Sequence, residues 1–139
     1  MTMRDFSNDH SALALNTASL GQNLEGHGAG WEPERVIDAC AARGFGSIVF
    51  WRREIGARAI EIGDRARAVG LSVAGLCRTP FLVGTEAIDK AAVLDEAKAS
   101  IDMAAGLGAA VLTIVVGGVH SGTKGTAESL KIVADRVAD

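Results

Sequence analysis

The sequence has no long apolar run, no surplus of basic residues and few cysteines, and each shortage excludes a class of protein. None of its apolar stretches reaches the ~18 consecutive residues that a membrane-spanning helix needs. The polar beginning, MTMRDFSNDHS, lacks the apolar core of a signal peptide. The net charge is −3, with 14 Lys and Arg against 17 Asp and Glu, so no basic excess exists for nucleic-acid phosphates. We therefore expect a cytoplasmic protein with neither nucleic-acid nor membrane partners.

Cysteine chemistry and the common catalytic motifs are equally scarce. Cys40 and Cys77 lie far apart with no metal-ligand spacing, so we expect free thiols in a reducing compartment. The sequence contains no G-x-x-x-x-G-K-[ST] phosphate loop, no G-x-S-x-G elbow and no H-E-x-x-H zinc motif. The function must therefore be inferred from the pattern of elements.

That pattern is strand followed by helix, four times over. Strands are predicted at 13–16, 46–50, 71–76 and 110–116, and helices at 33–43, 57–69 and 88–107, with a last one beginning near 127. Pro33 suits a first helical turn and Gly44 suits the end of that helix. Such alternation specifies an α/β fold with a parallel sheet. We expect a flexible leader over 1–11 and one domain over 12–139, since the length fits a single domain.

The chain is organised around the stretch AVLTIVVGGVH, residues 110–120. Val111 to Val116 is an unbroken apolar run rich in β-branched residues, which predicts a strand buried on both faces. Gly117 and Gly118 end it and permit a sharp turn. Because ligands bind beyond the carboxyl ends of parallel strands, this end is predicted to lie on a functional rim. The alternative is a plain exit from strand to loop.

Polar and aromatic side chains follow all four predicted strands, and we take them as candidate substrate-binding residues. They are Asn16, Trp51, Arg52, Cys77, Arg78 and His120. Arginines at two strand ends suit a phosphate, carboxylate or polyol, because a guanidinium donates hydrogen bonds in a planar fork. Their alternative role is pairing with Glu54, Glu86 or helix carboxylates. Trp51 suits either stacking on a sugar ring or capping a barrel mouth, and His120 suits either a ligand contact or a solvated loop.

Four segments together resemble a known family. LALNTAS, FWRREIG, GLSVAGLCRTP and LGAAVLTIVVGG are similar to segments of the sugar phosphate isomerase/epimerase family, the xylose isomerase-like TIM barrels related to apurinic endonuclease family 2. The resemblance covers about residues 13 to 137. It implies a (β/α)8 barrel of about twice this length, so the chain is expected to form four β/α units, the N-terminal half of such a barrel.

The family also implies a chemistry, namely proton transfer next to a carbonyl of a sugar, polyol or keto-acid substrate. Intact members are expected to hold a divalent metal (Mn, Mg or Zn) through acids and a histidine on later strands. No residue of this sequence matches that set, so no metal ligand and no catalytic residue is assigned. Where the endonuclease relatives carry a zinc-binding histidine after strand two, this chain has Trp51 and Arg52, which argues against a nuclease.

Two alternatives remain open at this point. One is a dehydratase or lyase of the same barrel superfamily. The other is a non-catalytic, small open-sheet α/β binding or interaction module. The uncharged run from Val111 to Val116 is typical of an unprotected sheet edge. We therefore expect either a homo-oligomer or a missing C-terminal half to cover it, with a small sugar-like molecule as the other partner.

Overall fold

Four parallel strands form one sheet in which the strands lie side by side in chain order. The computed structural model describes residues 5–22, 24–83, 89–118 and 126–138. The strands are β1 (Ala14–Asn16), β2 (Ser47–Trp51), β3 (Ser72–Cys77) and β4 (Leu112–Thr113). Every neighbouring pair is parallel, in the order β1-β2-β3-β4. All four carboxyl ends therefore lie along the same edge of the sheet.

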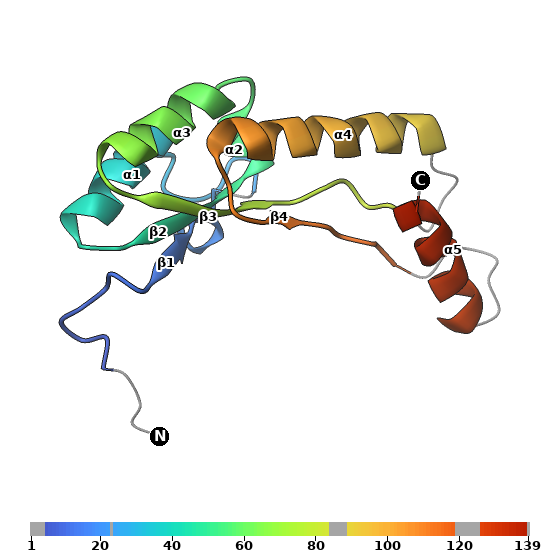
Figure 1. The fold of residues 1–139 in the computed structure, drawn as a ribbon, viewed down its shortest axis with the longest axis horizontal. Coiled ribbons are helices and arrows are strands. Elements are labelled where there is room, and N and C mark those ends of the chain that lie inside the picture. Colours follow the sequence, from blue (N-terminus) through green and yellow to red (C-terminus); the bar gives the residue numbers. More distant parts are fainter. Residues whose placement is uncertain (1–4, 23, 84–88, 119–125, 139) are drawn as a thin grey trace.

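The helices between the strands cover one face of this sheet. They are α1 (Pro33–Ala42), α2 (Arg52–Ile55), α3 (Ala59–Ala68) and α4 (Lys90–Leu107), and α5 (Thr126–Ala138) follows β4. α1 contacts α3 and α3 contacts α4, so these helices form a single layer (Figure 1). A barrel wall has its helices on one side, whereas a doubly wound sheet has them on both. The predicted α/β half barrel is thereby confirmed. None of the helices among the described residues is long and apolar enough to cross a bilayer.

The helix predicted over 57–69 is confirmed as α3, and a short helix that was not predicted, α2, precedes it. The chain turns into α2 directly after β2 and ends it at Gly56, whose φ of 54° lies in the left-handed region. It then begins α3 at Ala59. A glycine tolerates such a φ because it has no Cβ. The helix beginning at Pro33 also ends as predicted, and Gly44, which follows it, has a φ of 72°.

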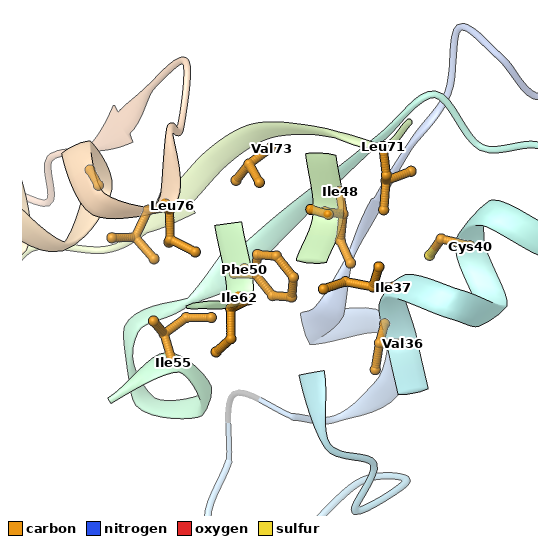
Figure 2. Packing of buried hydrophobic residues seen from close by; sticks show 13 residues of the cluster. Val36, Ile37, Cys40, Ile48, Phe50, Ile55, Ile62, Leu71, Val73 and Leu76 are labelled. Atoms are coloured by element: carbon orange, nitrogen blue, oxygen red, sulfur yellow. The ribbon is translucent and has the colours of Figure 1, made fainter. Parts of the chain in front are cut away.

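The hydrophobic core lies between the sheet and its helical layer. The fully buried members include Val36, Ile37, Ile48, Phe50, Ile55, Ile62, Leu71, Leu76 and Leu107. Figure 2 shows Phe50 of β2 among Ile37, Ile55 and Ile62. In β2, Ile48 and Phe50 alternate with less buried neighbours, as expected of a strand with one packed face. The second face of the sheet has no helical cover in the part of the chain that the structure describes.

A bulge in β3 sets which side chains reach each face. On its two sides the paired residues are Ile48–Val73 and Val49–Gly75. Ala74 is therefore an extra residue in β3. Beyond it, Leu76 lies in the core and Cys77 lies beside Trp51 on the open face.

The prediction of a strand over 110–116 buried on both faces is wrong. Regular pairing is confined to β4, and Val111, Ile114 and Val116 are 60%, 57% and 40% exposed. The chain stays extended past β4, however, and Gly117 bridges in parallel to Val83. An apolar run needs a layer on each side, and among the described residues only helices cover it, from one side.

The segment before β1 runs against the beginning of β2. The ring of His10 lies 5.6 Å from that of Phe45, and its Nδ1 is 2.9 Å from the carbonyl oxygen of Arg43. A Cβ on Gly46 would lie 1.8 Å from the carbonyl oxygen of Ser11. Residue 46 must therefore be glycine for the two backbones to approach this closely.

Candidate functional site

The ends of β1 and β2 are joined by a side-chain hydrogen bond. The indole N–H of Trp51 donates to Oδ1 of Asn16 over 2.9 Å. The same oxygen accepts from the backbone N–H of Ala18, which lies in the short 3-10 turn Thr17–Leu20. With both lone pairs of Oδ1 engaged, the amide NH2 of Asn16 is the part left to bind a ligand. Asn16 is exposed, so this group faces the open edge of the sheet.

Glu54 and Thr17 form a second link between the same two strand ends. Glu54, in α2, accepts a hydrogen bond from the backbone N–H of Trp51 over 2.7 Å and another from the hydroxyl of Thr17. Its second carboxylate oxygen is buried without a partner among the described residues. Burial raises the pKa of the Glu54 carboxyl above its usual range, although both hydrogen bonds act in the opposite direction.

Both residues follow predicted strands, but the sequence analysis did not select either of them as a substrate-binding residue. It gave Glu54 as a possible partner for the arginines. Neither Arg52 nor Arg53 forms an ion pair with Glu54 in the described part of the chain; Arg53 instead pairs with Glu25 over 3.2 Å. The available signal was the position of Glu54 three residues after a strand end, where a glutamate can accept from the N-cap backbone of the next helix.

Arg52 and Arg78 come from neighbouring strand ends and meet. Nη1 of Arg52 donates to the carbonyl oxygen of Arg78 over 3.4 Å. The guanidinium of Arg78 lies over the ring of Phe81 at 4.4 Å and 6.0 Å from the ring of Trp51. Both arginines line an open pocket of about 230 Å³ together with Trp51, Arg53, Cys77, Thr79 and Pro80. The pocket therefore combines aromatic surface with guanidinium donors.

Cys77 extends the row to the fourth strand. It lies opposite Trp51 in β2 and opposite Thr113 in β4. Its Sγ is 3.5 Å from Oγ1 of Thr113. Both cysteines are free: Cys77 is partly exposed, whereas Cys40 is buried in the core. Thr113 was not predicted as a site residue because it lay inside an apolar run that was expected to be buried.

The structure thus brings Asn16, Trp51, Arg52, Cys77 and Arg78 to the carboxyl edge of the sheet, and their part in substrate binding stays a prediction. His120 and Glu86 lie outside the described residues. A larger hollow of about 400 Å³ lies between the beginnings of β3 and β4, lined by residues such as Leu71 and Gly108. Since ligands of such folds bind at the carboxyl ends of strands, we assign the site to the smaller pocket.

The described residues do not fit a metal ion. Among residues 5–22, 24–83, 89–118 and 126–138, no three His, Cys, Asp or Glu side chains gather closely enough to hold one. Glu54 is the acidic side chain that the strand-end hydrogen bonds involve, and one of its oxygens already accepts two of them. No step of a reaction is therefore assigned to a metal in this chain.

Comparison with known proteins supports the fold. No model of a known protein family matches the sequence. No curated protein matches it either. Among solved structures, protein SMc04130 from Sinorhizobium meliloti 1021 superposes with a TM-score of 0.71 at 29% identity, over 91% of this chain and 44% of that one. A xylose isomerase-like TIM barrel/4-hydroxyphenylpyruvate dioxygenase fusion protein superposes with a TM-score of 0.61 at 17% identity, over 88% of this chain and 20% of that one.

These matches agree with the strand order and the single helical layer. The chain spans less than half the length of either similar structure. The second structure is described as a xylose isomerase-like TIM barrel in one part, and the likeness to it is one of fold. The chain accordingly has the fold of four β/α units of a TIM barrel.

Proposed function

We propose that this chain forms part of the substrate-binding wall of a sugar isomerase/epimerase-like barrel that acts by proton transfer next to a carbonyl. The observation that carries the proposal is the row of side chains at the carboxyl edge of the sheet, in which Trp51 donates a hydrogen bond to Asn16 and lies opposite Cys77 in the next strand. Active sites of TIM barrels lie at this edge. The resemblance of the four sequence segments supplies the reaction class.

Each member of the row has a role suited to a small polyhydroxylated molecule. The indole of Trp51, held by Asn16, offers an aromatic face to the apolar side of a sugar ring. The free amide N–H groups of Asn16 donate to hydroxyl or carbonyl oxygens. Arg52 and Arg78 donate from the adjacent strand end. These residues bind and orient, and the proton-transferring groups and the divalent metal of the intact family are expected on strands outside this sequence.

Ligand binding by the 139-residue chain tests the wall. Saturation-transfer NMR with a panel of ketoses, aldoses, polyols and keto acids is expected to detect at least one bound compound. Trp51→Ala should abolish that signal, whereas Trp31→Ala, at the other tryptophan, should preserve it. Absence of binding to the whole panel, or an equal loss in both variants, would contradict the proposal.

Proton exchange in the whole natural protein that contains these residues tests the reaction. In D2O with Mn²⁺, Mg²⁺ or Zn²⁺ present, a bound ketose or keto acid should incorporate deuterium next to its carbonyl. A dehydratase or lyase of the same superfamily would instead release an unsaturated product. We expect the 139-residue chain alone to show little exchange and no tight metal binding by calorimetry, because its described residues hold no cluster of metal ligands.

A further inference from the structure

Two guanidinium groups at the site have no carboxylate partner among the described residues. Arg52 forms a single long hydrogen bond, to a backbone carbonyl. Arg78 makes only ring contacts, with Phe81 and Trp51. The described arginines of α3, by contrast, are paired: Arg65 with Asp38, and Arg67 with Asp64. In this respect the pocket differs from the surface of α3.

One of the donors is also desolvated. Nε of Arg52 is buried and has no hydrogen-bond partner among the described residues. A buried donor on a charged group is costly when left unpaired, and such groups call for an explanation by a ligand or another partner. The neighbouring carboxylate, Glu54, does not supply it: its hydrogen bonds come from Thr17 and from the backbone of Trp51, and its second oxygen has no partner in the described part of the chain.

Arg78 is held in a way that leaves its donors available. Its guanidinium lies 4.4 Å from the centre of the Phe81 ring, an arrangement in which cation–π attraction fixes the group through its face. The N–H groups on its edge remain free to donate. Because the positive charge is retained by aromatic neighbours and not neutralised by an acid, it stays available to an anion.

We propose that the substrate carries an oxyanion, a phosphate or a carboxylate, and that Arg52 and Arg78 bind it together in the pocket at the ends of β2 and β3. The shared chemistry is charge-assisted hydrogen bonding, which is strongest when guanidinium groups meet such oxygens. The site lies on a chain of net charge −3, so the attraction is local to this pocket. The inference rests on the proposed function, because it treats the pocket as part of the substrate-binding wall.

An NMR titration of the 139-residue chain tests it with three probes. Inorganic phosphate, glycolate and the neutral polyol glycerol are added separately at constant ionic strength, and the side-chain Nε–H signals of the arginines are followed. Saturable shifts of the Arg52 and Arg78 signals by phosphate or glycolate are expected, while the Arg65 signal stays in place. Binding of phosphate alone assigns a phosphate ester, and binding of glycolate alone assigns a hydroxy acid.

Four substitutions separate a built site from general electrostatics. Arg52→Gln and Arg78→Gln should each weaken anion binding by about tenfold or more, the scale of a lost charge-assisted hydrogen bond. Arg65→Gln removes the same charge from α3, where Arg65 pairs with Asp38, and should leave binding unchanged. Arg78→Lys keeps the positive charge but loses the planar donors of the guanidinium group, and it should also weaken anion binding. Circular dichroism establishes that each variant is folded.

The outcomes distinguish this inference from the proposed function. Equal weakening by Arg65→Gln, or no anion binding while neutral sugars or glycerol bind at Trp51, overturns the anion site and leaves the sugar-binding wall intact. Anion binding that depends on Arg52 and Arg78, without deuterium exchange in the whole natural protein, supports the anion site and contradicts the isomerase chemistry. If the arginine-to-glutamine variants do not fold, the unsubstituted chain still decides: static Arg52 and Arg78 signals overturn the inference.

Discussion

Thr17 and Glu54 are separated by 37 positions in the sequence, yet their side chains join the ends of two neighbouring strands. Thr17 is fully buried and its hydroxyl donates to the carboxylate of Glu54. Glu54 in turn accepts from the backbone of Trp51, which donates to Asn16. At the scale of residues, the orientation of the tryptophan at the site therefore depends on a small polar network beneath it.

Thr17→Val should lower the free energy of unfolding by about 1–3 kcal/mol, the cost of leaving a buried acceptor without its donor. Valine has nearly the same shape as threonine, so packing is preserved. The matched control is Thr113→Val, an exposed position whose hydroxyl only approaches Cys77, where a change below about 0.5 kcal/mol is expected. Urea denaturation measures both, and equal losses would contradict a special role for Thr17.

Glu54 should make stability depend on pH in an unusual direction. Its pKa is raised by burial from an ordinary value of 4.5, so the folded protein holds this proton more tightly than the unfolded chain. Protonation then contributes stability that is complete below pH 4.5 and is lost as the pH rises through the raised pKa. Compared with Glu54→Gln, the unsubstituted protein should lose stability as the pH rises above 4.5.

Glu61 is the control for this measurement. A hydrogen bond from Arg58 lowers its pKa, so its contribution is present above pH 4.5 and is lost as the pH falls. Comparison with Glu61→Gln should therefore show the opposite slope. Denaturation curves across the pH range that give Glu54→Gln and Glu61→Gln the same slope would show that Glu54 is not desolvated.

The residues of the site were partly predictable. Asn16, Trp51, Arg52, Cys77 and Arg78 follow apolar runs, and parallel strands bring such positions to one edge whatever their exact pairing. The network beneath them was not predictable, because nothing local in the sequence links Thr17 to Glu54.

At the scale of elements, α3 and α4 approach so closely that backbone meets backbone. A Cβ on Gly63 of α3 would lie 2.5 Å from the carbonyl oxygen of Leu107, at the end of α4. Arg67, one turn further along α3, donates to the same carbonyl over 3.3 Å. The spacing of these two helices is consequently set at Gly63.

Gly63→Ala should destabilise the protein by about 1–2 kcal/mol, since overpacking costs about 1–3 kcal/mol and the gain in helix propensity offsets up to about 1 kcal/mol. Gly106→Ala, in α4, is the control: its Cβ would meet the side chains of Ala59 and Ile60 at 3.2 and 3.3 Å, contacts that are much less close than 2.5 Å and that small shifts relieve. In thermal unfolding, Gly63→Ala should have a clearly lower melting temperature than Gly106→Ala. The reverse order would contradict a backbone contact.

The elements themselves were predictable to different degrees. The helix beginning at Pro33 has both its end signals in the sequence, and it was predicted closely. The short helix α2 has Glu54 in its first turn and Gly56 at its end, but it has only four residues and was not predicted. For the run from Val111 to Val116, composition indicated a strand but could not indicate whether anything faces it.

At the scale of the whole molecule, the apolar residues around β4 are only partly covered by the described residues. Phe81, Val111, Ile114 and Val116 are all at least 40% exposed, and β4 pairs on one side only. Monomeric proteins usually protect such edges with charge, proline or a covering element.

We therefore expect the 139-residue chain to self-associate, and light scattering should give a mass above the 14.3 kDa of one chain. Ile114→Lys places a charge beside the open edge and should shift the population toward monomer. Leu24→Lys is the matched control, because Leu24 and Ile114 are both 57% exposed and Leu24 lies outside the sheet. A monodisperse monomer for the unsubstituted chain would mean that the edge is protected within the chain.

The bulge at Ala74 has a consequence for how chains of this kind can vary in length. A strand presents alternate residues to its two sides, and an extra residue changes which side each later residue faces. Removing Ala74 would leave Val73 and Leu76 two positions apart, so a regular strand with the same partners in β2 would keep Leu76 in the core and Cys77 on the open face. The loss of this one residue is therefore compatible with the site.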